Sequence, residues 1–231
     1  MTMEDPTTSL RPEVRSRGAL DRDERQVKDG ILRMGSLVES QIRLAIRALA
    51  ERDPGLARDV IAGDELVNGA QRVVNEAVVM TIATQSPVAR DLRFLLALSQ
   101  VGYELERIGD HATSVAKQVE RLSREPALRA TATVIRMGGL AADLVRAALE
   151  ALVGLDEDAA RGVAQRDDEI DHDYHALFSE VIEAMKADPA AIDRGTRLIL
   201  AAHWIERIGD RVTNIAEDVV YLASGDIEDL N

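Results

Sequence analysis

An internal duplication constrains the fold of this chain more than any other feature of its sequence. The eleven residues from Glu106 to Ala116 match those from Glu206 to Ala216 at seven positions. The apolar residues around this motif also recur 100 positions apart, at Leu98, Val101, Leu105, Ile108, Ala112, Val115, Val119 and Leu122, and again at Leu198, Ala201, Ile205, Ile208, Val212, Ile215, Val219 and Leu222. A second pair of similar segments, 64–68 and 167–171, precedes the first pair in the same order. The chain therefore contains two copies of one structural unit.

The spacing of these apolar residues predicts helices packed side by side. Intervals of three and four positions are typical of a helix that buries one face in a bundle. Helix breaks are expected where a capping residue precedes proline, at Asp53-Pro54, Ser86-Pro87 and Asp188-Pro189, with weaker breaks at Glu125-Pro126 and Gly154. The breaks predict six helices and no strand, at about residues 21–52, 55–84, 87–122, 126–153, 157–187 and 189–223. The predicted fold class is all-α, with two tandem three-helix bundles.

The same pattern predicts the domain organisation. Residues 1–21 contain Pro6, Pro12 and Gly18 and little apolar periodicity, which is typical of a flexible arm. We expect the first three-helix bundle at residues 22–123 and the second at 124–224. Residues 225–231 are expected to form an acidic tail.

Charge and composition exclude several functions. The net charge of −13 argues against nucleic-acid binding, which depends largely on Lys and Arg side chains that neutralise phosphates. Without cysteine the chain can form neither disulfides nor thiolate metal sites. No segment has the features of a signal peptide or a membrane span. We therefore expect a soluble cytoplasmic protein, and the sequence alone does not decide between a monomer and a homodimer.

Repeated pairs of acidic residues are the candidate functional groups. Glu106 and Asp110 are four positions apart, so they share one helix face, and Glu206 and Asp210 repeat the pair. Two such carboxylates repel each other, and a hard cation would remove the repulsion. Any one pair alone is more simply explained as a solvated helix face. The recurrence of the pair beside Gly109 and Gly209 favours a site, because glycine inside a helix costs about 1 kcal/mol and indicates close approach of a ligand or a neighbouring helix.

The preceding helices supply a second set of candidate ligands. Asp64 and Asn68 are four positions apart, and Asp167 and Asp171 repeat the spacing. The sequence therefore predicts two metal sites, one from Asp64, Asn68, Glu106 and Asp110, the other from Asp167, Asp171, Glu206 and Asp210. Because Asn68 is neutral, the second site should bind more tightly. These residues could also be polar positions that merely flank the apolar face.

Histidines are weaker candidates. Glu169 and His172 form one Glu-x-x-His motif, whereas ferritin-like di-iron proteins need two such motifs on separate helices. We expect His111 to face solvent, and we expect His203 and Trp204 to pack between helices. The chain contains no glycine-rich phosphate loop and no motif of a nucleophilic or zinc-dependent hydrolase.

The sequence resembles the PhoU family. The resemblance rests on the segment from Ser86 to Arg93, on the two copies of Glu-Arg-Ile-Gly-Asp, on Met34-Gly35 and on the two Asp-x-x-x-Asn/Asp motifs. It extends from about residue 22 to 224. The chain departs from the family where Arg211-Val212 replaces His-Ala and in its longer N-terminal arm.

The resemblance implies a regulator rather than an enzyme. It implies two three-helix bundles with multinuclear metal sites (iron, zinc, manganese or magnesium) at the paired acidic motifs. It also implies contacts with a phosphate-sensing histidine kinase and with the ATPase of the phosphate ABC transporter, through which the protein would modulate phosphate transport and restrain the phosphate-starvation response. The alternatives are an accessory regulator of another phosphate transporter and a helical, carboxylate-bridged metal enzyme or store.

Overall fold

The computed structural model describes residues 12–230, with side chains from Arg17 onward. Within this range the chain forms six α-helices and one short 3-10 helix, with no strand. The helices are α1 (Pro12–Glu51), α2 (Pro54–Gln85), α3 (Ala89–Leu122), α4 (Thr131–Gly154), α5 (Glu157–Ala187) and α6 (Ile192–Ser224), and the 3-10 helix η1 (Pro189–Ala191) precedes α6. The all-α fold class is therefore confirmed.

The first helix is longer than predicted. α1 begins at Pro12 rather than near residue 21, since proline is well tolerated in a first helical turn. Its early part is also held in place, because Leu20 is buried and the Arg17 Nη1 donates to Asp91 Oδ2 on α3 at 2.6 Å. Residues 1–11 of the predicted arm lie outside the described residues.

The fourth helix begins later than predicted, at Thr131 instead of residue 126. Proline disfavours a helical conformation at the residue before it, here Glu125. The backbone carbonyls of Ser123 and Glu125 accept hydrogen bonds from the guanidinium of Arg52. The link between the two halves is thus stabilised in a non-helical form.

Two of the three predicted proline caps are present. Asp53 Oδ1 accepts from the backbone N–H of Gly55 at 2.6 Å, and Asp188 Oδ1 accepts from that of Ala190 at 3.0 Å. The prediction is wrong for Ser86, which ends α2 in the left-handed conformation with φ of 47°. Val88 occupies the cap position of α3 instead and provides no side-chain hydrogen bond.

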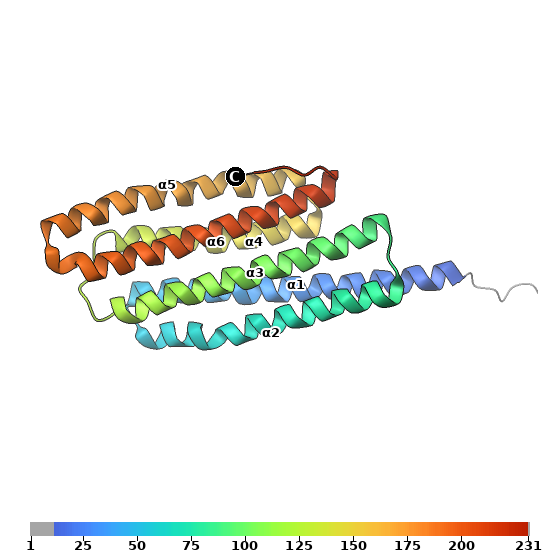
Figure 1. Cartoon of the computed structure of the whole chain (residues 1–231), viewed down its shortest axis with the longest axis horizontal. Coiled ribbons are helices and arrows are strands. Elements are labelled where there is room, and N and C mark those ends of the chain that lie inside the picture. The colour runs from blue at the N-terminus through green and yellow to red at the C-terminus, as the bar shows by residue number, and fades with distance from the viewer. Residues whose placement is uncertain (1–11, 231) are drawn as a thin grey trace, which may run out of the picture.

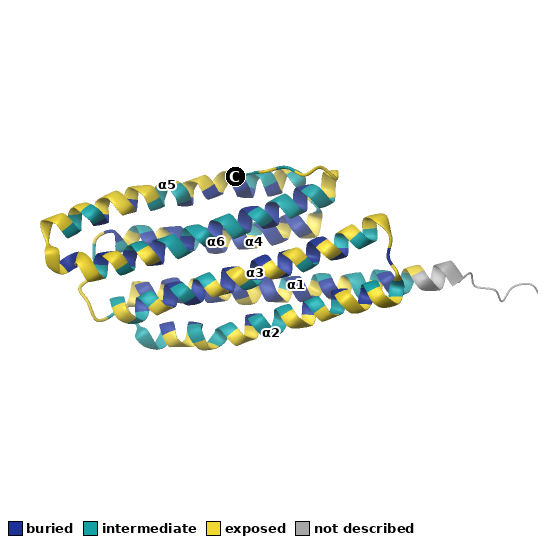
Figure 2. Ribbon diagram, viewed as in Figure 1, coloured by how far each residue is buried: buried dark blue, intermediate teal, exposed yellow. Residues whose placement is uncertain are grey.

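The helices form two groups of three along the chain. α1, α2 and α3 contact one another, as do α4, α5 and α6. Figure 1 shows α5, α6, α3 and α2 side by side in that order, with α4 and α1 behind them. The predicted apolar positions of α3 and α6 are all buried except Leu122 and Leu222, which are partly buried (Figure 2). None of the described helices is long and apolar enough to cross a membrane.

The two halves meet partly through α1 and α4, where glycines accept large side chains from the other helix. A Cβ atom built on Gly35 of α1 would lie 2.0 Å from Cδ1 of Leu149 on α4. A Cβ atom built on Gly138 of α4 would lie 2.1 Å from Cδ1 of Ile46 on α1. Gly35 and Gly138 are 103 positions apart, and so are Ile46 and Leu149. The two contacts are therefore equivalent: the glycine of each repeat accepts the large side chain of the other, as in a dimer with twofold symmetry.

The halves also meet through α3 and α6, and the same reciprocity holds there. His111 of α3 stacks on Trp204 of α6 with ring centroids 5.3 Å apart. At the equivalent positions, Arg211 Nη1 of α6 lies 3.5 Å from Glu104 Oε2 of α3. The expectation that Trp204 packs between helices is confirmed, but the solvent-facing position expected for His111 is wrong, because the indole of Trp204 covers its ring.

The two halves consequently share one apolar core. The buried side chains of all six helices form a single continuous cluster. Each half has the helix arrangement of a three-helix bundle, but its apolar surface is completed by the other half. The predicted boundary near residue 123 thus separates the two repeats in the sequence. It does not separate two cores, because the apolar core continues across it.

Candidate functional site

The first predicted set of acidic residues lies between α2 and α3. Asp64 on α2 accepts two hydrogen bonds, one from Thr113 Oγ1 on α3 at 3.1 Å and one from Asn68 Nδ2 at 3.2 Å. Burial, together with the charge of Asp110, raises the pKa of Glu106 above its ordinary value. Burial and the charge of Asp64 likewise raise the pKa of Asp110. The four residues of this first cluster therefore come from two adjacent helices and interact electrostatically.

The second predicted set lies between α5 and α6 and is more enclosed. Asp167 is buried, and its Oδ2 accepts from Thr213 Oγ1 of α6 at 3.1 Å. Its other oxygen, Oδ1, is buried without a hydrogen-bond partner among the described residues. Asp171, Glu206 and Asp210 are half-buried around it. This second cluster consists of four carboxylates and so carries more potential negative charge than the first.

Burial raises the pKa values of carboxylates in the second cluster, and it does so most at Asp167. Desolvation raises the pKa of Asp167 to about 7, with smaller contributions from Asp171, Asp210 and Glu206 and an opposing one from the Thr213 hydrogen bond. Burial also raises the pKa of Glu206 and Asp171, again reinforced by Asp210. A cation between these carboxylates would stabilise their charged forms.

A glycine stands at the same position of both repeats, Gly109 and Gly209, and allows side chains of neighbouring helices to approach closely at the clusters. A Cβ atom on Gly209 of α6 would lie 2.0 Å from Asp167 Oδ1, and one on Gly109 of α3 would lie 3.2 Å from Gln41 Oε1 and from Val67 Cγ1. The predicted close approach at these glycines is thus made by side chains of neighbouring helices. Gly209 leaves the space that the Asp167 carboxylate occupies.

Three polar residues that were not predicted as ligands support the clusters. Thr113 and Thr213 donate to Asp64 and Asp167 and are both buried, but neither was predicted as a site residue. The signal was present, since a threonine follows the Glu-x-x-x-Asp motif at the same position in both copies. Gln41 on α1 donates to Thr113 Oγ1 at 3.5 Å and extends the first network.

The second network lacks this third helix. The position on α4 equivalent to Gln41 is Leu144, 103 residues later, which is buried and apolar. No glutamine therefore reaches the second cluster from α4, which is consistent with the unpartnered oxygen of Asp167.

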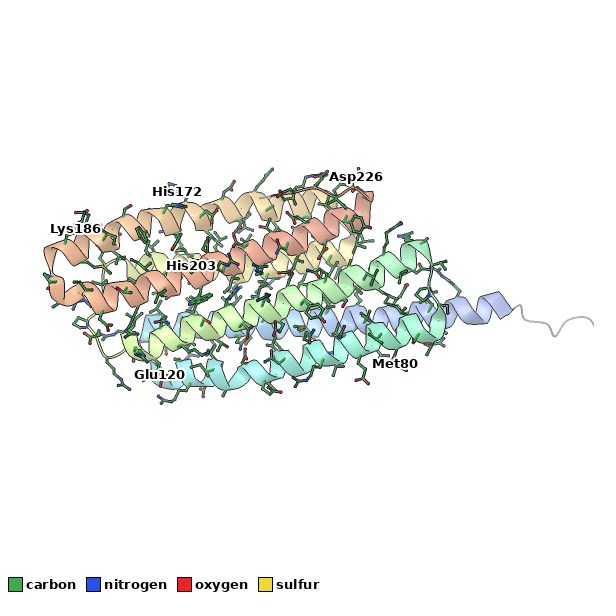
Figure 3. The ribbon with its side chains drawn as sticks, viewed as in Figure 1. Met80, Glu120, His172, Lys186, His203 and Asp226 are labelled. Atoms are coloured by element: carbon green, nitrogen blue, oxygen red, sulfur yellow. The ribbon has the colours of Figure 1, made fainter. Side chains whose placement is uncertain are left out.

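The histidines contribute little to the clusters. His172 is exposed on the outer side of α5 and points away from α6 (Figure 3), so the Glu169-x-x-His172 motif does not face the second cluster. His203, on α6, lies closer, with Nδ1 3.2 Å from Glu206 Oε2.

The chemistry of the donors fits a hard cation, although their present positions do not form a finished site. Oxygen donors from two helices suit magnesium, manganese or iron, and within residues 12–230 a buried oxygen of Asp167 lacks a hydrogen-bond partner. Among the residues that the structure describes, however, no three carboxylate or imidazole groups are arranged so that they could hold a metal ion together. Side chains would have to rotate toward one another to bind it.

These features define a class of protein: a duplicated six-helix protein in which each half carries a carboxylate cluster between its second and third helices. The PhoU domain matches this chain twice, at residues 31–119 and 134–219. The chain therefore belongs to the PhoU family.

Relatives of known name and structure cover nearly the whole fold. The phosphate-specific transport system accessory protein PhoU homolog of Clostridium acetobutylicum is 33% identical over 217 residues, which cover 94% of this chain and 99% of the relative. The crystal structure of PhoU from Pseudomonas aeruginosa is 37% identical with a TM-score of 0.86, covering 89% of this chain and 99% of that one. The crystal structure of the phosphate transport system regulatory protein PhoU from Streptococcus pneumoniae is 30% identical with a TM-score of 0.85, covering 91% and 99%.

Proposed function

We propose that this chain is a cytoplasmic, metal-binding regulatory accessory protein of a phosphate transport system, without enzymatic activity of its own. Its effect would arise from contacts with a phosphate-sensing histidine kinase and with the ATPase of the phosphate ABC transporter, and it would restrain the phosphate-starvation response when phosphate is plentiful. Family membership and the names of the relatives support the role in phosphate transport. The kinase and ATPase contacts rest on the family resemblance.

One observation carries the metal-binding part of the proposal. The same pair of acidic motifs occurs in both halves, and in the second half three further carboxylates lie near Asp167, whose buried Oδ1 has no hydrogen-bond partner among the described residues. Repulsion among these groups destabilises the metal-free form when they are charged. A divalent cation would neutralise the charge and link α5 to α6.

Metal binding is tested by removing two ligands of the second cluster. We expect the variant Glu206→Ala/Asp210→Ala to lose metal-dependent stabilisation of its half while retaining its helical content, because neither side chain is part of the apolar core. In the wild type, an ion at a hundredfold excess over its dissociation constant should raise the free energy of unfolding by about 2.7 kcal/mol. Thermal unfolding and calorimetric titration with Mg²⁺, Mn²⁺, Fe²⁺ and Zn²⁺ would measure both effects.

A matched control separates binding from loss of negative charge. Glu180→Ala/Glu183→Ala removes two exposed carboxylates from α5 outside the cluster, so it should titrate with metal as the wild type does. The metal-binding proposal would be abandoned if the Glu206/Asp210 variant titrated like the wild type, or if the wild type bound none of the four ions at micromolar concentration. Lowering the pH should weaken binding, because protons compete for the same oxygens.

The regulatory part of the proposal is tested separately. Purified protein should associate with the transporter ATPase or with the cytoplasmic part of the sensor kinase in pull-down and calorimetric experiments. It should not hydrolyse ATP or a phosphoester by itself. Absence of binding to both partners, or turnover at an ordinary enzymatic rate, would contradict the regulatory function and leave the metal-binding proposal to its own test.

A further inference from the structure

A pocket opens at the end of the molecule where α3 begins and where α4 and α6 end (Figure 1). Its volume is about 270 Å³, close to the lower limit of the roughly 300–1,000 Å³ that small-molecule sites occupy. Side chains of α1, α3 and α6 line it, together with Leu155, which follows the last residue of α4. No residue of the two carboxylate clusters is among them. We call this cavity the α3 pocket.

Positive charge gathers in the α3 pocket of an otherwise acidic protein. The lining includes four basic side chains and two acidic ones, namely Arg17, Lys28, Arg90, Arg93, Glu24 and Asp91. Four cations against two carboxylates leave a formal charge of +2 in the pocket, whereas the whole chain carries −13. An anion is therefore attracted to this pocket although the protein as a whole repels it.

Three of the four cations lack a bonded carboxylate. Arg17 is neutralised by Asp91, whose Oδ2 lies 2.6 Å from its Nη1. Lys28 Nζ instead donates to the backbone carbonyl of Val153 at 3.0 Å. Arg90 and Arg93 are exposed, and neither forms an ion pair with any carboxylate whose side chain the structure describes. Their guanidinium groups are thus available to a ligand.

The positive charge is a property of one half of the molecule. On the repeat offsets of 103 positions for α1 and 100 for α3, the residues equivalent to Lys28, Arg90 and Arg93 are Thr131, Ala190 and Asp193. Three cations in the first half thus correspond to two neutral residues and one acid in the second. Because both halves have the same helix arrangement, the fold itself does not require these basic residues at the start of α3.

The rest of the α3 pocket is apolar. Phe94, Leu155 and Leu222 complete its walls. Phe94 is partly buried against the core, so its ring has a fixed support. An aromatic ring beside cationic groups suits a ligand with both a flat organic part and phosphates, since nucleobases stack on such rings.

We propose that the α3 pocket binds a small molecule that carries two or more linked phosphate groups, such as inorganic diphosphate or a nucleoside di- or triphosphate. Guanidinium groups match phosphate oxygens in bidentate fashion, which assigns this role to Arg90 and Arg93. Lys28 supplies a further charge from α1. Linked phosphates can meet cations on two helices at once, whereas a single phosphate cannot. Binding here depends neither on the proposed metal sites nor on the proposed regulatory partners.

Calorimetric titration of the full chain identifies the ligand class. The metal-free protein is titrated with ATP, ADP, diphosphate and orthophosphate, because divalent ions would bind both to phosphates and to the carboxylate clusters. We expect the first three to bind at micromolar concentrations and orthophosphate to bind at least about tenfold more weakly. A preference for ATP over diphosphate would assign the organic part to the wall at Phe94, and equal affinities would assign the site to the phosphates alone. If none of the first three bound at millimolar concentration, or if orthophosphate bound as tightly, the proposal would be wrong.

A pair of arginine variants locates the site. Arg90→Ala/Arg93→Ala should weaken diphosphate and ATP binding at least about tenfold, because both bidentate contacts are lost. Arg121→Ala/Arg124→Ala removes the same charge from exposed positions at the other end of α3 and is the matched control. Circular dichroism checks that both variants are folded. Equal loss of binding in the two variants would show that only the overall charge matters and would overturn the proposal.

A gain of affinity provides an independent test. Glu24 opposes an anion in the α3 pocket, and its Oε1 is buried without a hydrogen-bond partner among the described residues. Glu24→Gln removes this negative charge with little change of shape, so it should strengthen binding of diphosphate and ATP severalfold. Added salt should weaken binding in the wild type and in this variant, since it screens the attraction. Unchanged or weaker binding by Glu24→Gln would contradict the assigned pocket.

Discussion

Gly209 of α6 lies directly against the Asp167 carboxylate of α5 in the second carboxylate cluster. Any Cβ atom there would fall 2.0 Å from Asp167 Oδ1 and 2.9 Å from its Cγ. Asp167 is buried between the helices, so its carboxylate has little room to move aside. The glycine is therefore a packing requirement of the cluster.

Alanine substitutions should rank these glycines by local space. Gly209→Ala should lower the free energy of unfolding by about 1–2 kcal/mol, because overpacking outweighs the gain in helix propensity. Gly162→Ala on α5, where a Cβ would meet no atom within 4 Å, should raise it by up to about 1 kcal/mol. Urea denaturation measures both, and a Gly209→Ala variant as stable as Gly162→Ala would contradict this account.

Asp218 is a second residue whose burial has a measurable consequence. It lies on α6, and its Oδ2 is buried without a hydrogen-bond partner among the described residues. Burial, with contributions from the charges of Glu104 and Glu217, raises its pKa to about 7. Because the folded protein holds this proton more tightly than the unfolded chain, the contribution of Asp218 to stability is most favourable below about pH 4 and falls as the pH rises to about 7.

Asp218→Asn should remove this part of the pH dependence. The neutral amide carries no charge to desolvate, so the variant should be more stable than the wild type at pH 8 and differ less from it at pH 5. The difference should amount to a few kcal/mol at most, since one pKa unit corresponds to about 1.4 kcal/mol. Urea denaturation in the presence of a chelator measures it, with exposed Asp226→Asn as the control. Parallel pH profiles for Asp218→Asn and wild type would refute the assignment.

At the scale of helices, the contacts between the halves depend on small residues that face large ones. Gly35 on α1 accepts Leu149 from α4, and Gly138 on α4 accepts Ile46 from α1. These reciprocal contacts set the distance between the two helices. Around them, Arg43 Nη2 donates to Asp143 Oδ1 at 2.7 Å, and Arg146 pairs with Glu39, so charged residues border the apolar contact.

A double-mutant cycle tests this pairing of α1 with α4. Gly35→Ala alone should lower the free energy of unfolding by about 1–3 kcal/mol, because its Cβ would overlap Cδ1 of Leu149. When Leu149→Ala has already removed that side chain, the same substitution should be neutral or stabilising. Equal effects of Gly35→Ala in both backgrounds would show that the two residues do not interact.

At the scale of the whole molecule, the shared core joins the two repeats into one structure. The interface of α3 with α6 is the most extensive between any two helices, and it lies between the halves rather than within one. Separating the halves would expose buried apolar side chains on four helices, α1, α3, α4 and α6. Such a cost favours unfolding of both halves together.

We therefore expect a single cooperative unfolding transition. Trp204 is the only tryptophan in the chain and stacks on His111 across the interface, so its fluorescence reports separation of the halves. Far-ultraviolet circular dichroism reports the helices of both. The two signals should give the same urea midpoint. Two separate midpoints would mean that the repeats unfold independently.

Local sequence patterns determined the helices, their order and the buried side of each. The three-and-four spacing predicted the apolar faces of α3 and α6, and aspartate before proline predicted the start of α2. The duplication determined that both halves carry a carboxylate cluster at the same place. The helices depend on residues a few positions apart, and the duplication appears when two segments are compared. Both kinds of pattern can be recognised in the sequence itself.

Only the tertiary structure decided which apolar faces meet and which polar groups find partners. The sequence of an apolar helix face does not show which other helix will cover it. The register between two distant helices produces no periodic pattern in the sequence of either helix. For this reason the sequence did not predict the contact of Gly35 with Leu149, the cover of Trp204 over His111, or the bond of Thr213 to Asp167. Ser86 was placed wrongly because its residue type favoured a cap at the start of α3, whereas its backbone N–H donates to Ile82 O and ends α2 in a left-handed conformation.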